Sequence, residues 1–329
     1  MKLDELAQLA GVSRTTVSYV VNGKAKQYRV SERTIEKVEA LIKQYDFKPN
    51  VMAAGLRAGK SNTIGLIIPD FENISYAKIA NGLENRCRAK GYQLLMACSN
   101  DNVNNEMECV KHLQQRQVDA LIVSTALDED SDFYQQNSRV PVIGFDRQIK
   151  ADHALNVQTD DQGDAMRLAE ALFKQKDYQR ILFLGALPEL FVSRERENGF
   201  RAALKERSVS VEFLYANHFH EESAAQAFKQ WLSKNPLPEA VFVTSLTLLQ
   251  GVFQVLLKQY KSIPQTLDVA TFGNHEMLDL LPNKVICSAQ NHEKVVNSLL
   301  GLVLYKLKHK KVNKPQDVLK REIIFRHCQ

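Results

Sequence analysis

The beginning of the chain has apolar residues at the spacing of a short amphipathic helix. This helix is expected over residues 3–10, with a buried face made of Leu3, Leu6, Ala7 and Ala10. Asp4 and Glu5 lie in its first turn, where the helix dipole favours acidic side chains. Gly11 can adopt the positive φ that ends a helix, and Ser13 is a good N-cap for a following one.

A second helix is predicted after Ser13, and its two faces differ in polarity. One face carries Thr16, Val17, Val20 and Val21, and the other carries Thr15, Ser18, Tyr19 and Asn22, with Arg14 at the N-terminal edge. A third helix is predicted over Ser31 to Tyr45, with an apolar stripe of Ile35, Val38, Leu41 and Ile42. Two short helices joined by a tight glycine turn and closed by a third predict a helix-turn-helix, whose second helix lies in the DNA major groove.

The segment that follows has its own pattern. Pro49–Leu56 is competent to form a short helix that begins at proline, and residues 57–61 have the composition of a linker. An isolated helix of this length is marginal in water, so we expect it to become ordered only when it is docked.

From Thr63 onwards, short apolar runs alternate with amphipathic helical stretches. Strands are predicted over Thr63–Ile68, Gln93–Cys98, Ala120–Val123, Val140–Phe145, Arg180–Gly185, Val211–Leu214, Ala240–Val243, Val269–Phe272, Val285–Ala289 and Leu319–Phe325. Helices are predicted between many of them, over Tyr76–Lys90, Asn104–Gln115, Asp164–Lys174, Gly199–Arg207, Glu221–Lys234 and Thr247–Gln259. Such alternation predicts parallel sheets covered by helices, in which ligands bind beyond the carboxyl ends of the strands.

The net charge of +5 is confined to the first fifth of the chain. Residues 1–60 contain eleven Lys and Arg against six Asp and Glu, whereas the remaining residues contain 32 of each sign. A basic segment joined to a neutral one is expected if only the first meets a polyanion such as DNA, although chance can also produce it.

The composition is that of a globular protein of two or three domains, with 329 residues, 44% hydrophobic and 25% charged. The five cysteines are scattered without CxxC pairs, which favours free thiols in a reducing cytoplasm over disulfides or a zinc site. No apolar run reaches the roughly 18 residues of a membrane span. The first residues carry acids instead of a signal-peptide core, so we expect a cytoplasmic protein.

Signatures of catalysis and of cofactor binding are not found in the sequence. None of the motifs GxxxxGK[ST], GxGxxG, GxSxG and HExxH is present, so neither an enzyme activity nor a cofactor is expected. His218 and His220 alternate as on one strand face but have no third ligand nearby, and we expect no metal there. Thr159–Asp164 has a weak likeness to a calcium loop and is better explained as the cap of the next helix.

The run Leu6-Ala7-Gln8-Leu9-Ala10-Gly11-Val12-Ser13, with Thr16-Val17-Ser18, Val21-Asn22 and Pro49-Asn50, resembles the lactose-repressor (LacI/GalR) family of transcriptional regulators. This signature spans the whole head and is highly specific. A closer likeness to the fructose repressors of the family is carried by Ser13-Arg14-Thr15-Thr16, by Tyr19 and by the long loop Asn22–Ser31, and it continues to near Phe325. The resemblance implies an N-terminal all-α helix-turn-helix head plus an α/β effector domain, similar to periplasmic sugar-binding proteins, of two parallel-sheet subdomains joined by three strand crossings.

On the family's pattern, the second helix supplies the contacts to base edges. These contacts fall to Arg14, Thr15 and Tyr19, and Arg14 suits the O6 and N7 acceptors of guanine. Leu56 matches the family's leucine that wedges into the minor groove. The alternative is that Leu56 is a core residue of the linker. Contacts to phosphates, which position the head without specifying sequence, are expected from Ser13, Ser18, Asn22, Lys24, Lys26, Tyr28 and Arg29.

The resemblance also implies an effector site in a cleft between the two subdomains. Its residues, carried over position by position, are Asp70, Asp146, Arg147, Ser193, Arg194, Arg196, Ser245, Asn274 and Gln290. They are expected at or just beyond strand ends, in agreement with the rule for parallel sheets. For each arginine the alternative is a surface salt bridge.

The chain departs from the common family pattern in ways that favour an anionic ligand. Ser245-Leu246 stands where many members have Asn-Asp, and Asn274 where many have Asp, so a carboxylate is lost at each place. Arg147, Arg194 and Arg196 supply cationic forks suited to phosphate. The likeness to fructose repressors implies a sugar phosphate as inducer, either fructose 1-phosphate or fructose 1,6-bisphosphate. A neutral sugar or a purine is the alternative.

We expect three regions in the chain. They are a helix-turn-helix DNA-binding domain at 1–48, a hinge helix and linker at 49–61, and an effector-binding and dimerisation domain at 62–329, with subdomains at roughly 62–160 plus 291–320 and 161–290 plus the C-terminal end. A pseudo-palindromic operator requires a two-fold protein, so a homodimer or a homotetramer is expected. The competing functions are a sugar-transport protein, which needs a signal peptide and no basic head, and a phosphosugar enzyme, which needs an acid–base constellation that we do not find.

Overall fold

The computed structural model describes residues 1–48, 59–205, 207–309 and 318–328, and the chain divides into two compact units, Met1–Ser61 and Asn62–Gln329. The hinge segment and Leu56 therefore lie outside the described residues. Each unit has its own hydrophobic core, and each is described by itself below.

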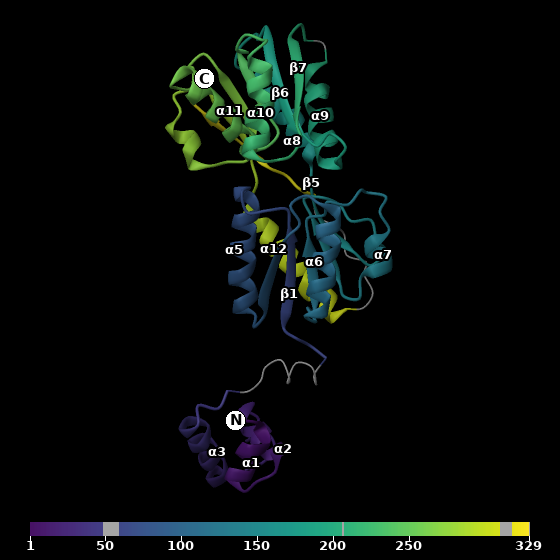
Figure 1. Ribbon diagram of the computed structural model, residues 1–329, viewed down its shortest axis with the longest axis vertical. Helices are drawn as coiled ribbons and strands as arrows, with labels where there is room; N and C mark the ends of the chain where they lie inside the picture. Colours follow the sequence, from purple (N-terminus) through teal and green to yellow (C-terminus); the bar gives the residue numbers. More distant parts are fainter. Residues whose placement is uncertain (49–58, 206, 310–317, 329) are drawn as a thin grey trace. The chain divides into compact units, whose positions relative to one another are not determined.

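The first unit is a three-helix domain whose helices, labelled in Figure 1, are α1 (Leu3–Ala10), α2 (Arg14–Val21) and α3 (Glu32–Gln44). Its core is built on the fully buried side chains of Leu6, Val17 and Val38. Gly11 has a φ of 64° at the end of α1, and Ser13 and Ser31 accept hydrogen bonds from backbone N–H groups in the first turns of α2 and α3. The three helices and their caps confirm the helix-turn-helix prediction.

The second unit begins with a sheet of strand order β11-β5-β4-β3-β1-β2, parallel throughout. Its strands are β1 (Thr63–Ile68), β2 (Gln93–Cys98), β3 (Ala120–Val123), β4 (Val142–Phe145), β5 (Leu155–Thr159) and β11 (Val318–Leu319). One face is covered by α5 (Ile74–Ala89) and α12 (His292–Lys308), and the other by α6 (Val103–Gln115) and the short α7 (Phe133–Asn137). We call this part the N-subdomain.

The second sheet has strand order β12-β10-β9-β8-β6-β7, and β12 alone runs antiparallel to its neighbour among the described strands. Its strands are β6 (Arg180–Ala186), β7 (Ser210–Ala216), β8 (Ala240–Val243), β9 (Asp268–Phe272), β10 (Val285–Ala289) and β12 (Glu322–Arg326). One face is covered by α8 (Asp161–Phe173) and α9 (Phe191–Leu204), and the other by α10 (Glu221–Leu232), α11 (Leu246–Tyr260) and the 3-10 helix η1 (Glu276–Leu280). We call this part the C-subdomain.

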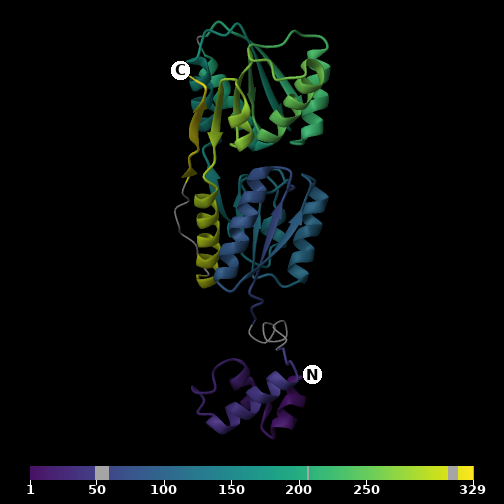
Figure 2. The ribbon, with the colours of Figure 1, turned by 90° about the vertical axis from the view of Figure 1, so that its left-hand side faces the viewer.

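The chain passes between the two subdomains three times: from β5 to α8, from β10 to α12 and from β11 to β12. In Figure 2 the yellow helix α12 lies in one subdomain and the strand segments that follow it lead to the other. Each sheet is therefore assembled from segments that are far apart in the sequence.

Several elements differ from the prediction, among them α7, α12 and η1, which were not predicted. β5 was not predicted, because Leu155–Thr159 is short and carries Asn and Gln within it. The run Leu319–Phe325 is not one strand but is split between β11 and β12, with Arg321 at the crossing. Helix α9 begins at Phe191, eight residues before the predicted start, because its buried face includes the charged Arg196, which interrupts the apolar pattern.

Glycine is required where two helices of the C-subdomain cross. A Cβ added to Gly251 on α11 would lie 2.4 Å from the carbonyl oxygen of Glu221 and 2.8 Å from Cβ of Ala224, both on α10. Gly301 on α12 is exposed and has open space around it.

Replacing Gly251 by alanine should therefore destabilise the second unit by about 1–3 kcal/mol, because the two backbones must move apart. The matched change Gly301→Ala should stabilise it by about 0.5–1 kcal/mol, because alanine loses less backbone entropy in a helix. Urea unfolding of both variants followed by circular dichroism measures the difference. Equal midpoints for the two variants would contradict this packing.

Candidate functional site

The first candidate site is the outward face of α2 in the head. Val17 and Val20 are buried against the core, whereas Arg14 and Thr15 on the opposite side are exposed. Nε of Arg14 lies 3.2 Å from a carboxylate oxygen of Asp4, and both side chains are more than half exposed. An exposed ion pair of this kind contributes little, so Arg14 is free to exchange Asp4 for another acceptor.

The loop after α2 packs onto this face through an aromatic stack. The rings of Tyr19 and Tyr28 are parallel, with centroids 3.9 Å apart and an interplanar angle of 4°. Ala25 is buried, and its carbonyl accepts a hydrogen bond from Val30 N–H at 2.9 Å. This stack connects a predicted base-contacting residue with a predicted phosphate-contacting one, and it was not predicted from the sequence.

The other residues predicted to contact phosphate lie around the same helix. Asn22 donates through Nδ2 to the carbonyl of Ser18 at 2.7 Å, so these two side chains are held together. The side chains of Lys24, Lys26 and Arg29 are exposed. One exposed helix face bordered by three cations is the arrangement that contacts a nucleic-acid backbone.

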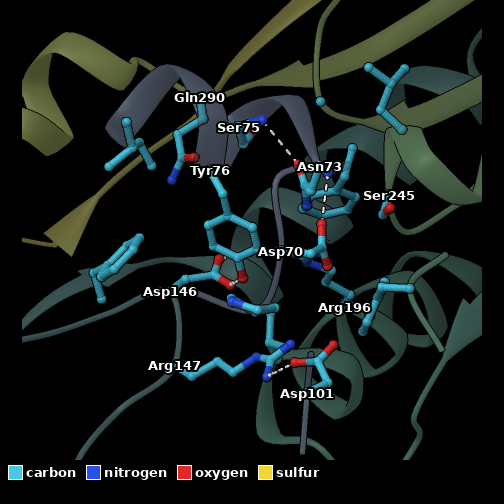
Figure 3. A pocket seen from close by; sticks show the side chains of 18 of the residues that line it. Asp70, Asn73, Ser75, Tyr76, Asp101, Asp146, Arg147, Arg196, Ser245 and Gln290 are labelled. Carbon is cyan, nitrogen blue, oxygen red and sulfur yellow. Dashed lines mark hydrogen bonds and ion pairs between the residues drawn. The ribbon is translucent and has the colours of Figure 1, made fainter. Parts of the chain in front are cut away.

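The second candidate site is a cavity of about 790 Å³, including its open mouth, in the second unit (Figure 3). Its wall is formed by residues that follow strand ends in both subdomains, by α5 and α9, and by Arg321 at the third crossing. The cavity therefore lies where the carboxyl ends of the parallel strands meet, as the topology predicts.

Six of the nine predicted effector residues line this cavity: Asp70, Asp146, Arg147, Arg196, Ser245 and Gln290. The other three do not. Ser193 is buried in α9 and donates to the carbonyl of Ala186, and Asn274 accepts a hydrogen bond from Arg326 at 2.7 Å. These two side chains already have protein partners that the sequence did not reveal.

Arg194 also lies outside the cavity wall. Its guanidinium contacts the carbonyl of Glu189 and lies 3.5 Å from a carboxylate oxygen of Glu129, and the side chain is about half exposed. This is the salt bridge that the sequence analysis considered as the alternative for Arg194. The pair joins α9 of the C-subdomain to the loop after β3 of the N-subdomain.

A buried carboxylate holds two of the cavity's guanidinium groups. Nε of Arg196 donates to Oδ1 of Asp161 at 2.8 Å, and Nη1 of Arg321 donates to the same oxygen at 3.1 Å. Arg321 also donates to Asp164 at 3.0 Å, and Arg196 to the carbonyl of Thr244 at 2.8 Å. Burial alone raises the pKa of Asp161, but the charges of Arg321 and Arg196 outweigh it and lower this pKa to about 2.

The N-subdomain contributes a second polar group to the wall. Nη1 of Arg147 donates to Asp101 at 2.6 Å and to the carbonyl of Thr125 at 3.1 Å. Tyr76 on α5 donates through its hydroxyl to Oδ2 of Asp146 at 2.7 Å, and Figure 3 shows this contact beside Arg147. Asp146 has a φ of 63°, which is uncommon for a residue other than glycine.

Sequence reasoning missed Arg321, Asp101 and Tyr76 as residues of the wall. A charged residue within the apolar run Leu319–Phe325 was the available signal for Arg321. The wall contains three aspartates, the predicted Asp70 and Asp146 and the unpredicted Asp101, together with three arginines. The wall is therefore balanced in charge, and each guanidinium already has a carboxylate partner.

Among the described residues, no group of three or more His, Cys, Asp or Glu side chains could hold a metal ion. The run Thr159–Asp164 acts as a helix cap, as predicted, since Asp160 accepts a hydrogen bond from Gly163 N–H at 3.1 Å. Within the part of the chain that the structure covers, no helix has the length and apolar character to cross a membrane.

Two family patterns match the chain and together span it almost completely. Bacterial regulatory proteins of the lacI family match residues 2–50, and the periplasmic binding proteins and sugar binding domain of LacI family match residues 61–323.

Individual relatives are similar over nearly the whole length. The catabolite repressor/activator of Salmonella typhimurium is 51% identical over 99% of this chain and 98% of its own. The fructose operon regulatory protein of Vibrio cholerae is 45% identical over 92% of this chain and 93% of its own. Among solved structures, the Cra transcriptional dual regulator of Pseudomonas putida in complex with fructose 1-phosphate is 34% identical, with a TM-score of 0.74 over 80% of this chain and 98% of that one.

Replacing Tyr28 by alanine should weaken binding to a specific DNA duplex by roughly 2- to 10-fold, because the stack on Tyr19 contributes about 0.5–1.5 kcal/mol. Tyr28→Phe keeps the ring and removes the hydroxyl, so it should lose only the proposed hydrogen bond to phosphate and bind more tightly than Tyr28→Ala. Fluorescence anisotropy with a duplex selected from a random library measures both variants. Equal losses for the two would show that Tyr28 acts through its hydroxyl and not through the stack.

His292 gives the second unit a pH-dependent stability. Its Nε2 lies 3.1 Å from Oγ of Ser75, a residue of the cavity wall. Burial, followed by the charges of Lys78 and Arg321, lowers the pKa of His292 from 6.5 to about 4. Because the folded-state pKa lies below the unfolded one, neutral His292 contributes stability above pH 6.5 that is lost as the pH falls towards 4.

Between pH 7 and pH 5, the wild type should lose about 1–2 kcal/mol more stability than a His292→Gln variant, a range that allows for the partial exposure of the ring. Parallel urea titrations at several pH values give this difference. Identical pH profiles for the two proteins would show that His292 is readily protonated in the folded state.

Proposed function

Because the chain belongs to the LacI family of bacterial regulatory proteins, we propose that it binds operator DNA through its head and leaves the operator when a phosphorylated sugar occupies the cavity. The chain is a DNA-binding transcriptional regulator rather than an enzyme, because it belongs to this family and is similar to regulators of sugar metabolism. The cytoplasm is the compartment in which such a regulator meets DNA.

The proposed DNA contacts follow the exposed side of the head. Arg14, Thr15 and Tyr19 contact base edges in the major groove. Leu56 enters the minor groove at the operator centre. The residues proposed to contact phosphates are Ser13, Ser18, Asn22, Lys24, Lys26, Tyr28 and Arg29.

Fructose 1-phosphate is the proposed effector, and the arginines of the cavity wall are the observation that carries the proposal. Arg196 and Arg321 converge on one carboxylate oxygen of Asp161, so their remaining N–H groups are available to an anion beside them. The Pseudomonas putida relative was solved with fructose 1-phosphate. A neutral sugar or a purine gives no role to two adjacent guanidinium groups and is less well supported.

Contacts across the cleft provide a route from the cavity to the head. Two ion pairs join the N-subdomain to the C-subdomain: Asp146–Arg196 at 4.0 Å and Glu129–Arg194 at 3.5 Å. Nε2 of His220 also lies 3.6 Å from a carboxylate oxygen of Asp70 across the same cleft. A ligand held between Arg147 and Arg196 changes the relative position of the subdomains. Pro49–Leu56 then no longer pairs with its copy in the minor groove, and by linkage operator DNA weakens effector binding by the same factor.

Two copies of the chain are proposed to act together, as a homodimer or as a tetramer of such dimers. One head of this size contacts too few base pairs for tight specific binding, and a pseudo-palindromic operator has two half-sites. Dimerisation is assigned to the effector domain, which leaves both heads free for DNA.

Calorimetry with fructose 1-phosphate and the full-length protein tests the effector. The wild type should bind it, and in a gel shift the ligand should release the operator. Arg196→Gln should bind the ligand about 10- to 100-fold more weakly, because a charged hydrogen bond is lost, and should stay on the operator. Arg194→Gln is the matched control outside the cavity and should change the affinity by less than about threefold.

No heat of binding at millimolar fructose 1-phosphate would remove the effector proposal and leave the DNA-binding function in place. An equal loss of affinity in the Arg194 and Arg196 variants would contradict the division of roles between them.

A further inference from the structure

Glu106 is a buried carboxylate that lies outside the cavity wall. It belongs to α6, has no exposed surface and accepts three hydrogen bonds. The hydroxyl of Thr125 donates at 2.6 Å, the hydroxyl of Tyr134 donates at 2.5 Å, and the backbone N–H of Ala126 is the third donor. All three donors are neutral groups. A charge held in the core by neutral partners is uncommon, because its desolvation is costly.

The three donors fix the loop that follows β3. Thr125 and Ala126 lie directly after the strand, and Tyr134 lies on α7 at the far end of the loop. The hydroxyl of Thr125 also accepts a hydrogen bond from Leu127 N–H at 3.0 Å. All four residues are buried. One carboxylate therefore joins α6 to the start of the loop and to α7.

The same loop carries the contacts that hold two groups of the cavity wall. The carbonyl of Thr125 accepts a hydrogen bond from Nη1 of Arg147 at 3.1 Å. The hydroxyl of Ser124 lies 3.1 Å from that of Tyr76, which donates to Asp146. Arg147, Tyr76 and Asp146 line the cavity (Figure 3). A single residue, Thr125, thus lies between the buried carboxylate and the guanidinium of Arg147.

The partners of Glu106 require a group that only accepts. Two hydroxyls and one backbone N–H donate to it, and an ionised carboxylate offers two acceptor oxygens and no donor. An amide has one acceptor oxygen and two N–H donors of its own, so glutamine here leaves at least one buried donor without an acceptor. Burial raises the pKa of Glu106, and the hydrogen bonds and the charge of Arg147 offset this only in part.

We propose that Glu106 is a positioning residue for Arg147: it fixes the carbonyl of Thr125 where that carbonyl orients the guanidinium towards the effector. The inference rests on the proposed function, in which the effector lies between Arg147 and Arg196. It makes effector affinity depend on a residue in the core of the N-subdomain that does not contact the effector. The competing explanation is that Glu106 only stabilises this subdomain. The two explanations differ in whether the effect of Glu106 passes through Arg147.

Calorimetry with fructose 1-phosphate and the full-length protein tests the positioning role. Glu106→Gln should bind the ligand about 10-fold more weakly than the wild type, because Arg147 loses its fixed orientation. In a gel shift without ligand it should bind the operator like the wild type, since the head has its own core. Glu108→Gln is the matched control. Glu108 is exposed on the same helix, so this variant should change the affinity for the ligand by less than about twofold.

A double-mutant cycle with Arg147→Lys separates positioning from stability. If Glu106 acts through Arg147, adding Glu106→Gln to Arg147→Lys should weaken binding further by less than about twofold, because the guanidinium is already absent. A role in stability alone gives the same loss of affinity in both backgrounds.

Thr125→Val and Thr125→Ser decide the question if Glu106→Gln does not fold or if the Arg147 variant binds no ligand. Valine removes the hydroxyl that donates to Glu106 and keeps the backbone carbonyl that holds Arg147. Serine keeps both groups. The valine variant should therefore bind fructose 1-phosphate at least about threefold more weakly than the serine variant.

The possible results separate the explanations. Wild-type affinity in Glu106→Gln would overturn the inference, and so would an equal loss with and without Arg147. Equal affinities of the valine and serine variants of Thr125 would also overturn it. A wild type that binds no fructose 1-phosphate would instead reject the proposed function itself, and this inference with it.

Discussion

The buried carboxylate of Asp161 is the contact on which the cavity depends. Two guanidinium groups, from Arg196 in α9 and from Arg321 at the last crossing, donate to one of its oxygens. Removal of one member of such a buried set leaves an uncompensated charge, which is strongly destabilising. The carboxylate therefore fixes both arginines in place and at the same time ties the final crossing of the chain to the start of α8.

The architecture makes this convergence possible. In a parallel sheet all strands end at the same edge, so short segments after β1, β2, β4, β8 and β10 meet in space although they are far apart in the sequence. The two sheets direct these edges towards one cavity. Specificity then depends on a few charged side chains whose partners come from distant segments, as Arg321 binds Asp161 and Asp164.

Local sequence signals were sufficient where the structure depends on local interactions. Ser13 and Ser31 were predictable caps, because a cap is satisfied by its own helix, and the strand ends were predictable from short apolar runs. The position of Arg196 was predictable only through the family resemblance. Arg196 lies on the buried face of α9, so this charged residue interrupts the apolar pattern from which the helix would be predicted. Asp101, Tyr76 and Arg321 were not predicted, since their place in the wall follows from tertiary packing.

Six of the nine residues carried over from the family pattern line the cavity, and three do not. The side chains of Ser193, Arg194 and Asn274 are bound to the carbonyl of Ala186, to Glu129 and to Arg326. A family pattern predicts where a residue lies on the backbone. The partner of its side chain depends on the surrounding residues of this chain, which the pattern does not contain.

The three crossings between the subdomains also govern the order in which the protein can form during synthesis. The N-subdomain lacks its covering helix α12 and its edge strand β11 until the last tenth or so of the chain has been made, and the C-subdomain lacks β12 for even longer. Contacts of such long range slow folding, and the half-covered sheets expose apolar surface in the meantime. The head needs only contacts within its first 48 residues. On the ribosome, the part that binds DNA is thus complete well before the part that controls it.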